Sequence, residues 1–495
     1  MAKPNPRKEL PAPGKSNMLF GGGVVLATIA AVVIWKIANK PPAPPPSAPT
    51  QSPSAPTQSP SAPSPSSPSP SASAAALPPS SSASVDPSSP SEPALAWLRA
   101  YGGSGADALK AIAATGSAVY GAVDGLDDDG HRDAAIVSFS PDGDLLWEQG
   151  LTNHEDLDVR AIAVSGDRVM VAGLFEKHLE GGKERIDAKG AWGVFLAELA
   201  SDTGAVRTLR AYGGKGFAIA GARLAMAADE NGVVLGGAFA GTIDLGCGET
   251  TAAGSLDGFV ARIDPKGKCA FVRALGDAQD QAVDSVAIEA SGEIAIGGEL
   301  TGAIDFGGGK LTSEGGRDLF VANLDAKGAP LWTHRIGRAT SKAGVARVAV
   351  NRLGAVALAG WTEANELQIA RFAPGGKLEV TRSIQATAPR SIGFAMNDDA
   401  EALLVLPFEG SLELGDGASM PSRGKTDLAL LSLDAKGVIT HATQLGDPDS
   451  QCEIEACTSS ATAFGSTFYA GGFFEHHLTP TVEAVGGDAF LLKLR

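Results

Sequence analysis

One unit recurs along most of this sequence, and the recurrence limits the possible folds more than any other feature does. Its marker is an acidic residue, an apolar strand-like run and a Gly turn, as in Asp257–Gly267 and Asp318–Gly328. Counting weaker copies gives seven starts, at Asp133, Gly193, Asp257, Asp318, Glu366, Asp427 and Asp488. Successive starts lie 60, 64, 61, 48, 61 and 61 residues apart. A period of this length indicates an array of similar supersecondary units.

Each unit contains four strand-like runs. In the fourth unit we predict them at residues 285–290, 293–300, 318–325 and 330–336. Short β-rich runs joined by Gly turns, without a helical period, favour all-β structure. Four strands in each of seven units predict a seven-bladed β-propeller over residues 94–495.

The chain ends before the seventh unit reaches a fourth strand. A matching run stands at the other end of the repeat region, where Leu98–Gly103 has the same sequence as Leu209–Gly214 of the second unit. We therefore expect this N-terminal strand to complete the seventh blade and close the ring. Closure removes open sheet edges that would otherwise pair with other chains.

A different kind of segment precedes the repeats. Residues 18–38 are mostly apolar, and their only charge is Lys36 near the end. Twenty-one residues at 1.5 Å per residue span a hydrocarbon core of roughly 30 Å, so we predict a transmembrane helix. A cleaved signal peptide is the alternative, but its apolar run is usually about 7–15 residues and ends in a small-x-small site, which is missing here.

Basic residues indicate the orientation of this helix. Four precede it, in a tail of residues 1–17 expected in the cytoplasm, and two, Lys36 and Lys40, follow its uncharged stretch of residues 18–35. The positive-inside rule then places the N-terminus inside and the propeller in the periplasm or outside the cell. The chain is thus expected in the cytoplasmic (inner) membrane with a single pass.

Residues 39–93 connect the helix to the repeats. Eighteen prolines fall between Pro41 and Pro93, and the 45 residues after Lys40 carry no charge. Such a sequence buries too little apolar area to offset its ordering entropy, so we expect a disordered linker. Its Pro content favours extended polyproline II, so that it acts as a spacer.

The charge balance excludes one class of partner. The −16 of the whole chain and the +5 of residues 1–40 leave −21 for residues 41–495. So acidic a domain repels a phosphate backbone, and nucleic-acid binding is not expected. Nine acidic residues are expected in between-blade loops, where they solubilise the surface or attract a basic partner or cations. They are Asp156, Asp158, Asp277, Asp280, Asp284, Asp447, Asp449, Glu453 and Glu455.

At the level of motifs, the sequence resembles the bacterial SBBP-repeat β-propeller proteins. The resemblance is carried by Gly236–Gly246, Gly297–Gly309 and Asp318–Ala322 and covers about 400 residues. It implies an exported or surface-located propeller, in a group mostly without an assigned activity. The first and fifth units lack the Ile-Asp-Phe-Gly insert that belongs to the pattern.

The lengths of the connections suggest which face of the propeller is functional. Connections from second to third strands share one face with the between-blade loops, and they hold long inserts at 241–256, 301–317 and 410–426. Long loops on a rigid scaffold commonly carry function, so a binding site is expected on this loop-rich face. Alternatively, part of each insert extends the strands as a hairpin.

One acidic loop resembles a calcium site. Asp127, Asp129 and Asp133 hold positions three, five and nine of an Asp-x-Asp-x-Asp-Gly-x-x-Asp pattern, in which oxygen ligands surround a hard cation. Gly125 occupies the first ligand position, where Asp is preferred. A solvated acidic hairpin is the alternative. Calcium is the only possible cofactor that the sequence suggests.

Four cysteines allow three pairings. We favour Cys247–Cys269 and Cys452–Cys457, which are both local and suit an extracytoplasmic location. Free thiols are the alternative. Zinc binding would require short Cys or His spacings, and these are missing.

The sequence contains no recognisable catalytic motif. We therefore predict a monomeric, non-enzymatic binding or scaffolding propeller for a protein or glycan. Two alternatives are a hydrolase or lyase acting on envelope polymer and a calcium-dependent adhesion module. An enzyme would gather residues such as His154, Asp156 and Asp284 near the axis.

Overall fold

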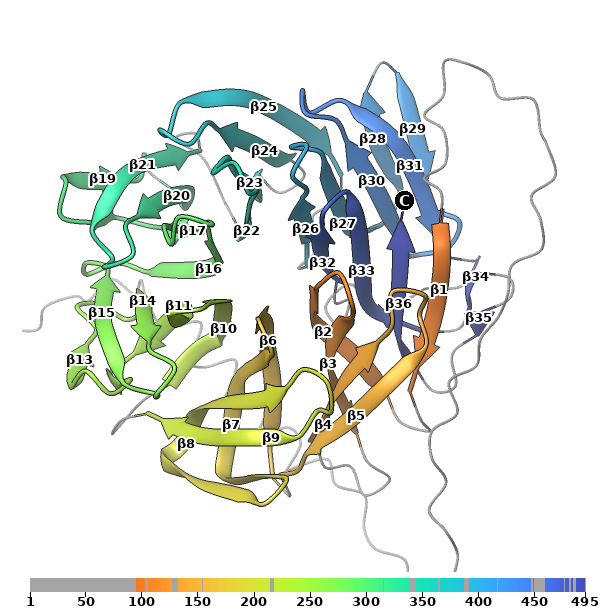
Figure 1. The fold of residues 1–495 in the computed structure, drawn as a ribbon. Coiled ribbons are helices and arrows are strands. Elements are labelled where there is room, and N and C mark those ends of the chain that lie inside the picture. The colour runs from red at the N-terminus through yellow and green to blue at the C-terminus, as the bar shows by residue number, and fades with distance from the viewer. Residues whose placement is uncertain are drawn as a thin grey trace, which may run out of the picture. The chain divides into compact units, whose positions relative to one another are not determined.

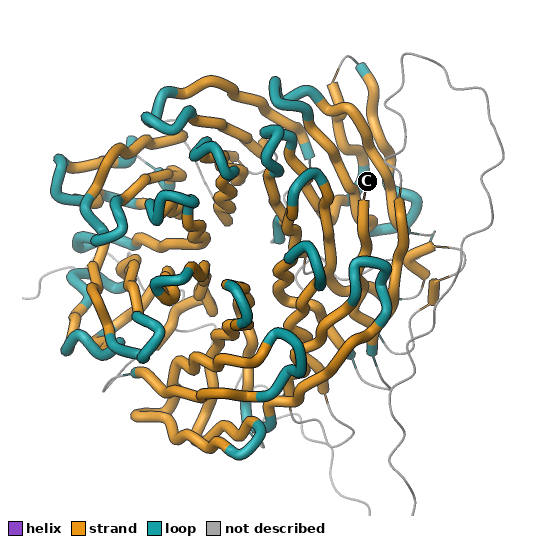
Figure 2. Tube along the Cα trace, viewed as in Figure 1, coloured by secondary structure: helices purple, strands orange, loops and turns teal. Residues whose placement is uncertain are grey.

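The computed structural model describes residues 95–102, 106–126, 132–153, 155–213, 218–314, 316–337, 344–363, 366–386, 391–415, 417–446, 448, 459–475, 477–479, 482–483 and 487–494. All regular elements in these ranges are β-strands, joined by turns and loops (Figure 2). The predicted tail, transmembrane helix and linker lie outside them. Within the described ranges, no helix has the length and apolar character needed to cross a bilayer.

The described strands form seven four-stranded antiparallel sheets arranged around a common centre (Figure 1). The seven-bladed β-propeller expected from the repeats is confirmed. Blades 1 and 2 comprise, from the axis outward, β2 (Asp107–Ala114), β3 (Val119–Leu126), β4 (Arg132–Phe139) and β5 (Leu145–Leu151), then β6 (Leu157–Ser165), β7 (Arg168–Gly181), β8 (Glu184–Ala200) and β9 (Val206–Tyr212).

The next three blades follow the same order. They comprise β10 (Ala218–Asp229), β11 (Gly232–Ala240), β14 (Asp257–Ile263) and β15 (Cys269–Leu275); β16 (Gln281–Ile288), β17 (Ile294–Leu300), β20 (Asp318–Leu324) and β21 (Pro330–Ile336); and β22 (Gly344–Val350), β23 (Val356–Glu363), β24 (Glu366–Phe372) and β25 (Leu378–Gln385). In blade 4 the strands predicted from the sequence are found to within four residues at either end.

The last two blades include the closure of the ring. They comprise β26 (Gly393–Met396), β27 (Ala402–Phe408), β30 (Asp427–Leu433) and β31 (Ile439–Leu445), then β32 (Ser459–Phe464), β33 (Thr467–Phe474), β36 (Asp488–Leu494) and β1 (Leu95–Tyr101). Strand β1 pairs with β36 from Leu95↔Leu494 to Tyr101↔Ala489. The two ends of the repeat region therefore complete one sheet, as the sequence match predicts.

The second and third strands of each blade form most of the core. Every residue of β17, β20 and β27 is buried, whereas the outer strand β5 alternates between half-buried and exposed positions. Neighbouring blades cover both faces of the inner strands, so their sequences are continuous apolar runs. The outer strands have solvent on one side and keep a period of two.

Paired glycines in second strands allow neighbouring strands to approach closely. A Cβ on Gly298 would lie 1.9 Å from the carbonyl oxygen of Ala282, and one on Gly297 would lie 2.6 Å from Val348 of the next blade. Both distances are too short for a side chain. The Gly-Gly pair in the repeat therefore serves strand pairing and blade stacking.

A second contact between blades explains the Gly that ends the marker. The outer strand of one blade presses a large side chain against the turn between third and fourth strands of the next blade. Trp332 of blade 4 covers Gly376 of blade 5, where a Cβ would lie 2.5 Å from the ring, and Gly376 has φ +80°. In the same way Trp97 covers Gly143, and its Nε1 donates to the Pro141 carbonyl at 2.9 Å.

The acidic residue that opens the marker is also structural. The carboxylate of Asp257 accepts the backbone N–H of Ala253 at 2.8 Å, and that of Asp318 accepts the N–H of Glu314 at 2.9 Å. Both aspartates are buried. Each closes the loop that leads into its strand, because a buried carboxylate needs hydrogen-bond donors.

The long inserts mostly fold as small hairpins of their own. These are β12 (Thr242–Asp244) with β13 (Glu249–Thr251), β18 (Ala303–Asp305) with β19 (Lys310–Thr312), β28 (Ser411–Gly415) with β29 (Ala418–Pro421), and β34 (His477–Thr479) with β35 (Val482–Glu483). In blade 2 the insert instead extends β7 and β8 as one continuous hairpin, which is the alternative that the sequence left open.

The inserts fasten each blade to the one before it. Asp244 of blade 3 exchanges two backbone hydrogen bonds with Gly213 at the end of blade 2, and Gly446 of blade 6 donates to Leu478 of blade 7. Their apolar residues are fully or almost fully buried in the core, among them Ile243, Leu245, Ile304, Phe306, Leu412 and Leu478. Much of each insert therefore stabilises the ring and is not available to a ligand.

A disulfide bond joins Cys247, in the loop of the blade 3 hairpin, to Cys269 at the start of β15, with an S–S distance of 1.99 Å. This is the local pairing that the sequence favours. Cys452 and Cys457 lie outside the described residues, so their pairing stays a prediction.

Replacing Trp97 by Ala tests ring closure. Trp97 is 8% exposed and contacts Tyr469 and Gly143. We expect the free energy of unfolding in urea to fall by about 3–5 kcal/mol, as is usual for loss of a buried Trp. Leu146→Ala is the control, because Leu146 is 53% exposed on an outer strand and should change stability little. Equal effects of the two substitutions would contradict closure through β1.

Replacing both Cys247 and Cys269 by Ser tests the disulfide. The bond closes a loop of 22 residues, which in the chain-entropy account stabilises the fold by about 3 kcal/mol. Urea unfolding without reductant should show a loss of that size. An unchanged unfolding midpoint would mean that the bond does not form or does not stabilise blade 3.

Candidate functional site

Irregularities in the innermost strands bring charged residues to the propeller axis. The register of these strands shifts at Lys110 in β2, at Arg160 in β6, at Asp284 in β16 and at Val345 in β22. A β-bulge leaves one residue outside the ladder and re-aims its side chain. Three of these four extra residues are charged, and all three line the axial channel.

The innermost strands enclose an axial pocket of about 260 Å³. All seven blades contribute to its wall. The charged lining residues are Lys110, Arg160, Asp284 and Arg347, and apolar side chains such as Ile112, Ile162, Met226, Val286 and Phe394 surround them. The apolar side chains are themselves buried, so most of the wall that faces the pocket is polar.

An ionic network joins blades 3, 4 and 5 beside this pocket. Arg223 on β10 contacts Asp284 at 2.8 Å and Glu299 on β17 at 3.2 Å. The same carboxylates accept backbone N–H groups of the next blade, Glu299 from Val345 at 2.7 Å and Asp284 from Ala346 at 3.1 Å. Both acids are almost fully buried, so their charges depend on these partners.

Burial changes the ionisation of two groups in this network. It raises the pKa of Asp284 to about 6, with a further rise from the Glu299 carboxylate that Arg223 and Arg347 oppose. Burial also lowers the pKa of Arg347 below its ordinary value. Both shifts have the same cause, because a low-dielectric environment disfavours each charged form.

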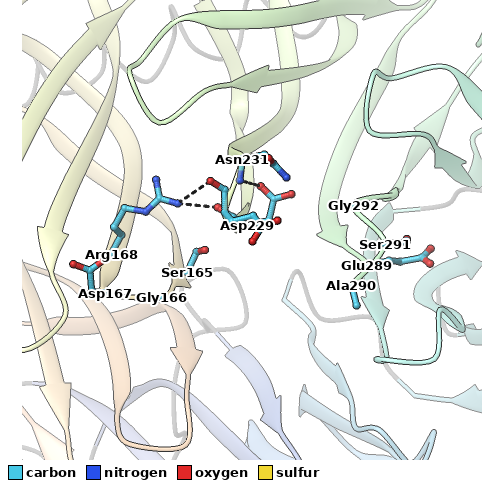
Figure 3. Close-up of a pocket in the computed structure, with 11 residues that line it drawn as sticks. Ser165, Gly166, Asp167, Arg168, Asp229, Asn231, Glu289, Ala290, Ser291 and Gly292 are labelled. Atoms are coloured by element: carbon cyan, nitrogen blue, oxygen red, sulfur yellow. Dashed lines mark hydrogen bonds between the residues drawn. The ribbon is translucent and has the colours of Figure 1, made fainter.

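A second cavity lies on the face of the propeller opposite the loop-rich face. We call this opposite face the turn face, because the short turns between the first and second strands of the blades lie there. The volume of the cavity is about 560 Å³, and such turns from blades 2, 3 and 4 line it. Figure 3 shows Arg168 of blade 2 pointing toward the turn of blade 3, with Glu289 and Ser291 of blade 4 across the cavity.

Hydrogen bonds fix the side chains of this turn-face cavity. Arg168 donates to the Asp229 carbonyl at 2.9 Å and so links blades 2 and 3. The Asp229 carboxylate accepts from Arg262 at 2.8 Å. Glu289 accepts from Asn323 at 2.9 Å, while burial and the neighbouring Glu293 raise its pKa to about 7. The cavity is therefore preorganised and rich in carboxylates.

The structure only partly covers the predicted calcium loop. Asp127 and Asp129 lie outside the described residues. Asp133 is the second paired residue of β4 and lies opposite Gly125, and its carboxylate accepts the backbone N–H of Asn153 at 3.1 Å. No cluster of three or more metal-ligating His, Cys, Asp or Glu side chains occurs among the residues described. Calcium binding stays a prediction.

The acidic residues expected in between-blade loops have different positions. Asp158 and Asp284 lie within the innermost strands β6 and β16, so their assignment to loops was wrong. Asp277 does lie in the loop between blades 3 and 4, but its carboxylate accepts the N–H groups of Gln279 and Ala303, which lowers its pKa. Asp156 is exposed in its loop, away from the position of Asp284 in the channel, and His154 lies outside the described residues.

The axial network was not predicted from the sequence. Its basic members Arg223 and Arg347, and Arg160 of the same pocket, lie in first strands otherwise rich in Ala, Val and Leu. A charged residue within an apolar strand is the one local signal for such a position. The sequence does not show that three blades direct these residues to the same place.

Comparison with known proteins gives distant structural similarities and no match in sequence. No family model and no curated protein matches the sequence. Among solved structures, BamB from Moraxella catarrhalis is similar with 12% identity and a TM-score of 0.37, over 77% of this chain and 83% of that one. Quinohemoprotein alcohol dehydrogenase from Comamonas testosteroni is similar with 10% identity and a TM-score of 0.42, over 81% and 76%.

A protein of unknown function from Dyadobacter fermentans DSM 18053 is similar with 12% identity and a TM-score of 0.41, over 68% of this chain and 95% of that one. At such identities and TM-scores the comparisons assign no ligand or activity to this chain.

Replacing Arg223 by Ala tests the axial network. Asp284 and Glu299 would then face each other without the arginine between them, and stability at pH 8 should fall by about 3 kcal/mol. The pKa of Asp284 is higher in the folded state than in the unfolded chain, so protonation below pH 6 favours the folded state. The loss measured by urea unfolding should therefore be smaller at pH 5 than at pH 8.

Arg185→Ala is the matched control. Arg185 pairs with Glu180 on the extended blade 2 hairpin, and both side chains are about half exposed. Exposed pairs contribute about 0–1 kcal/mol, so stability should change little at either pH. A pH-independent loss for Arg223→Ala would show that Asp284 does not titrate in this window.

Proposed function

We propose that this chain is a membrane-anchored, extracytoplasmic binding or scaffolding module that uses its propeller to hold a partner protein or glycan. The single observation that supports the proposal best is the turn-face cavity, in which turns of three consecutive blades surround about 560 Å³ with fixed polar side chains. Preorganised groups lose little freedom on binding, which favours affinity.

The turn face is a better candidate than the loop-rich face that we first expected. The described inserts of the loop-rich face bury their apolar residues between blades, whereas Glu230, Asn231 and Ser291 at the turn face are exposed. Their side chains offer hydrogen bonds to a ligand without rearrangement of the ring. Binding residues are often found on such connections of a rigid scaffold.

The chemistry of the cavity indicates the kind of partner. The acidic lining residues are Asp167, Asp229, Glu230 and Glu289, beside one basic lining residue, Arg168. Asp167 pairs with Arg207 and Asp229 with Arg262, so Glu230 and, above its pKa of about 7, Glu289 are the carboxylates that attract a basic surface. We therefore favour a protein that presents Lys or Arg, while a glycan would use the same carboxylates and Asn231 as hydrogen-bonding partners for its hydroxyl groups.

The proposed location follows from the sequence. An uncleaved helix at residues 18–38 and the linker at 39–93 would hold the propeller away from the inner membrane, with the N-terminus inside. The resemblance to SBBP-repeat proteins supports an exported location. The proposal therefore includes a single-pass anchor and a partner in the cell envelope.

Site-specific photo-crosslinking in cells tests the proposal. A photoreactive residue at Ser291 of the full chain should yield a defined adduct in the envelope fraction, and mass analysis should identify it as protein or glycan. Glu230→Lys should reduce the yield severalfold, because it reverses a charge in the cavity without touching the core.

A photoreactive residue at Lys310 is the control, since this position is exposed on the β18–β19 hairpin of blade 4. Adducts at Lys310 with none at Ser291 would move the binding site to the loop-rich face. The absence of adducts at both positions would contradict a binding role for either face.

A further inference from the structure

The axial pocket contains a guanidinium that the described part of the protein leaves without a carboxylate partner. Arg347 on β22 donates through Nη1 to the carbonyl oxygens of Ala346 at 3.0 Å and Asp284 at 3.4 Å. Among the described residues, no carboxylate oxygen lies within ion-pair distance of it and no acceptor receives a bond from its Nε or Nη2. Arg347 is half-buried, and within the described part of the protein the Asp284 carboxylate opposes its charge only from beyond ion-pair distance.

A second arginine of the pocket has unused donors. Arg160 on β6 forms an ion pair with Asp158 through Nη2, but its buried Nε has no acceptor in the described structure. Lys110 on the neighbouring strand β2 lies 3.7 Å from Asp124. The pocket lining thus contains three cations and one carboxylate, Asp284, whose two oxygens already accept hydrogen bonds from Arg223 and Ala346.

We propose that this axial pocket binds a small organic carboxylate, with Arg347 as its main partner and Arg160 and Lys110 supplying further positive charge. The planar guanidinium presents its donors in a fork that matches a carboxylate. The carboxylate would fill the unused donors and compensate the charge of Arg347.

The size and wall of the pocket define the ligand further. Its volume of about 260 Å³ is below the roughly 300–1,000 Å³ of pockets for drug-sized ligands, so the ligand is small. Ile162, Met226, Val286 and Phe394 lie among the charged groups but are buried, so they leave room for only a short hydrocarbon chain. An organic acid and inorganic phosphate both have the anionic oxygens that Arg347 recognises, and the planar carboxylate matches the planar guanidinium in a bidentate pair.

Binding should depend on pH in one direction. Asp284 faces Arg223 on β10, Glu299 on β17 and Arg347 with the backbone of Ala346 on β22. When Asp284 takes up a proton as pH falls through about 6, a negative charge that repels the ligand is removed. The affinity for a carboxylate should therefore be higher at pH 5.5 than at pH 7.5.

Titration calorimetry of the full chain in detergent tests the inference, with glutarate, butyrate and inorganic phosphate as probes at constant ionic strength. Wild-type protein should bind glutarate or butyrate more tightly than phosphate. Arg347→Gln removes charge-assisted hydrogen bonds and should weaken carboxylate binding by about tenfold or more. Arg352→Gln is the matched control, because Arg352 lies in the same blade, is 70% exposed and pairs with Asp398. The carboxylate affinity of this variant should differ from that of wild type by less than twofold.

Arg160→Gln provides a second variant in case Arg347→Gln does not fold, and it should weaken binding severalfold. The inference is overturned if wild-type protein shows no heat of binding with either carboxylate at 20 mM. It is also overturned if phosphate binds more tightly than both acids, or if Arg347→Gln and Arg160→Gln bind as well as wild type. The crosslinking experiment on the turn face uses none of these probes. A negative result in one experiment therefore overturns one proposal and leaves the other unaffected.

Discussion

The structure depends on the pairing of β1 with β36, which joins the two ends of the repeat region in one sheet. Each blade is stable only because its inner strands pack between two neighbours, so an open array would leave two apolar faces exposed. With β1 in place the innermost strands contact each other in a complete circle, from β2 through β16 to β32 and back to β2. The axial pocket exists only as a result of this closure.

Most of the sequence repeat serves contacts between blades. The marker acid closes a loop, as Asp257 and Asp318 show, and the Gly pair of β17 allows a neighbouring strand to approach. The terminal Gly of the marker receives a large side chain from the preceding blade, as Gly376 receives Trp332. The inserts between second and third strands also join each blade to the one before it. A repeated residue in this protein is therefore in general a structural residue.

The residues of the two candidate sites are the ones that do not repeat. Lys110, Arg160 and Asp284 are the bulge residues of three innermost strands and differ in charge or length, whereas Arg347 lies two residues after the bulge of a fourth. The turn-face cavity likewise depends on Arg168 and Glu289, each present in one blade only. Because each site combines different residues from several blades, it breaks the sevenfold similarity of the ring.

The sequence alone determined the number of blades and the closing strand, because spacing, periodicity and matching motifs are properties of consecutive residues. It favoured the local Cys247–Cys269 pairing among three, and the structure contains that bond. It did not reveal the roles of the inserts, whose Ile243 and Phe306 look like loop residues until the neighbouring blade covers them. It also misplaced Asp158 and Asp284 in loops. Only the tertiary structure decided which charged residues meet at the axis. A β-bulge in one strand and a carboxylate in the next blade become neighbours because the ring closes, and no pattern along the chain shows this.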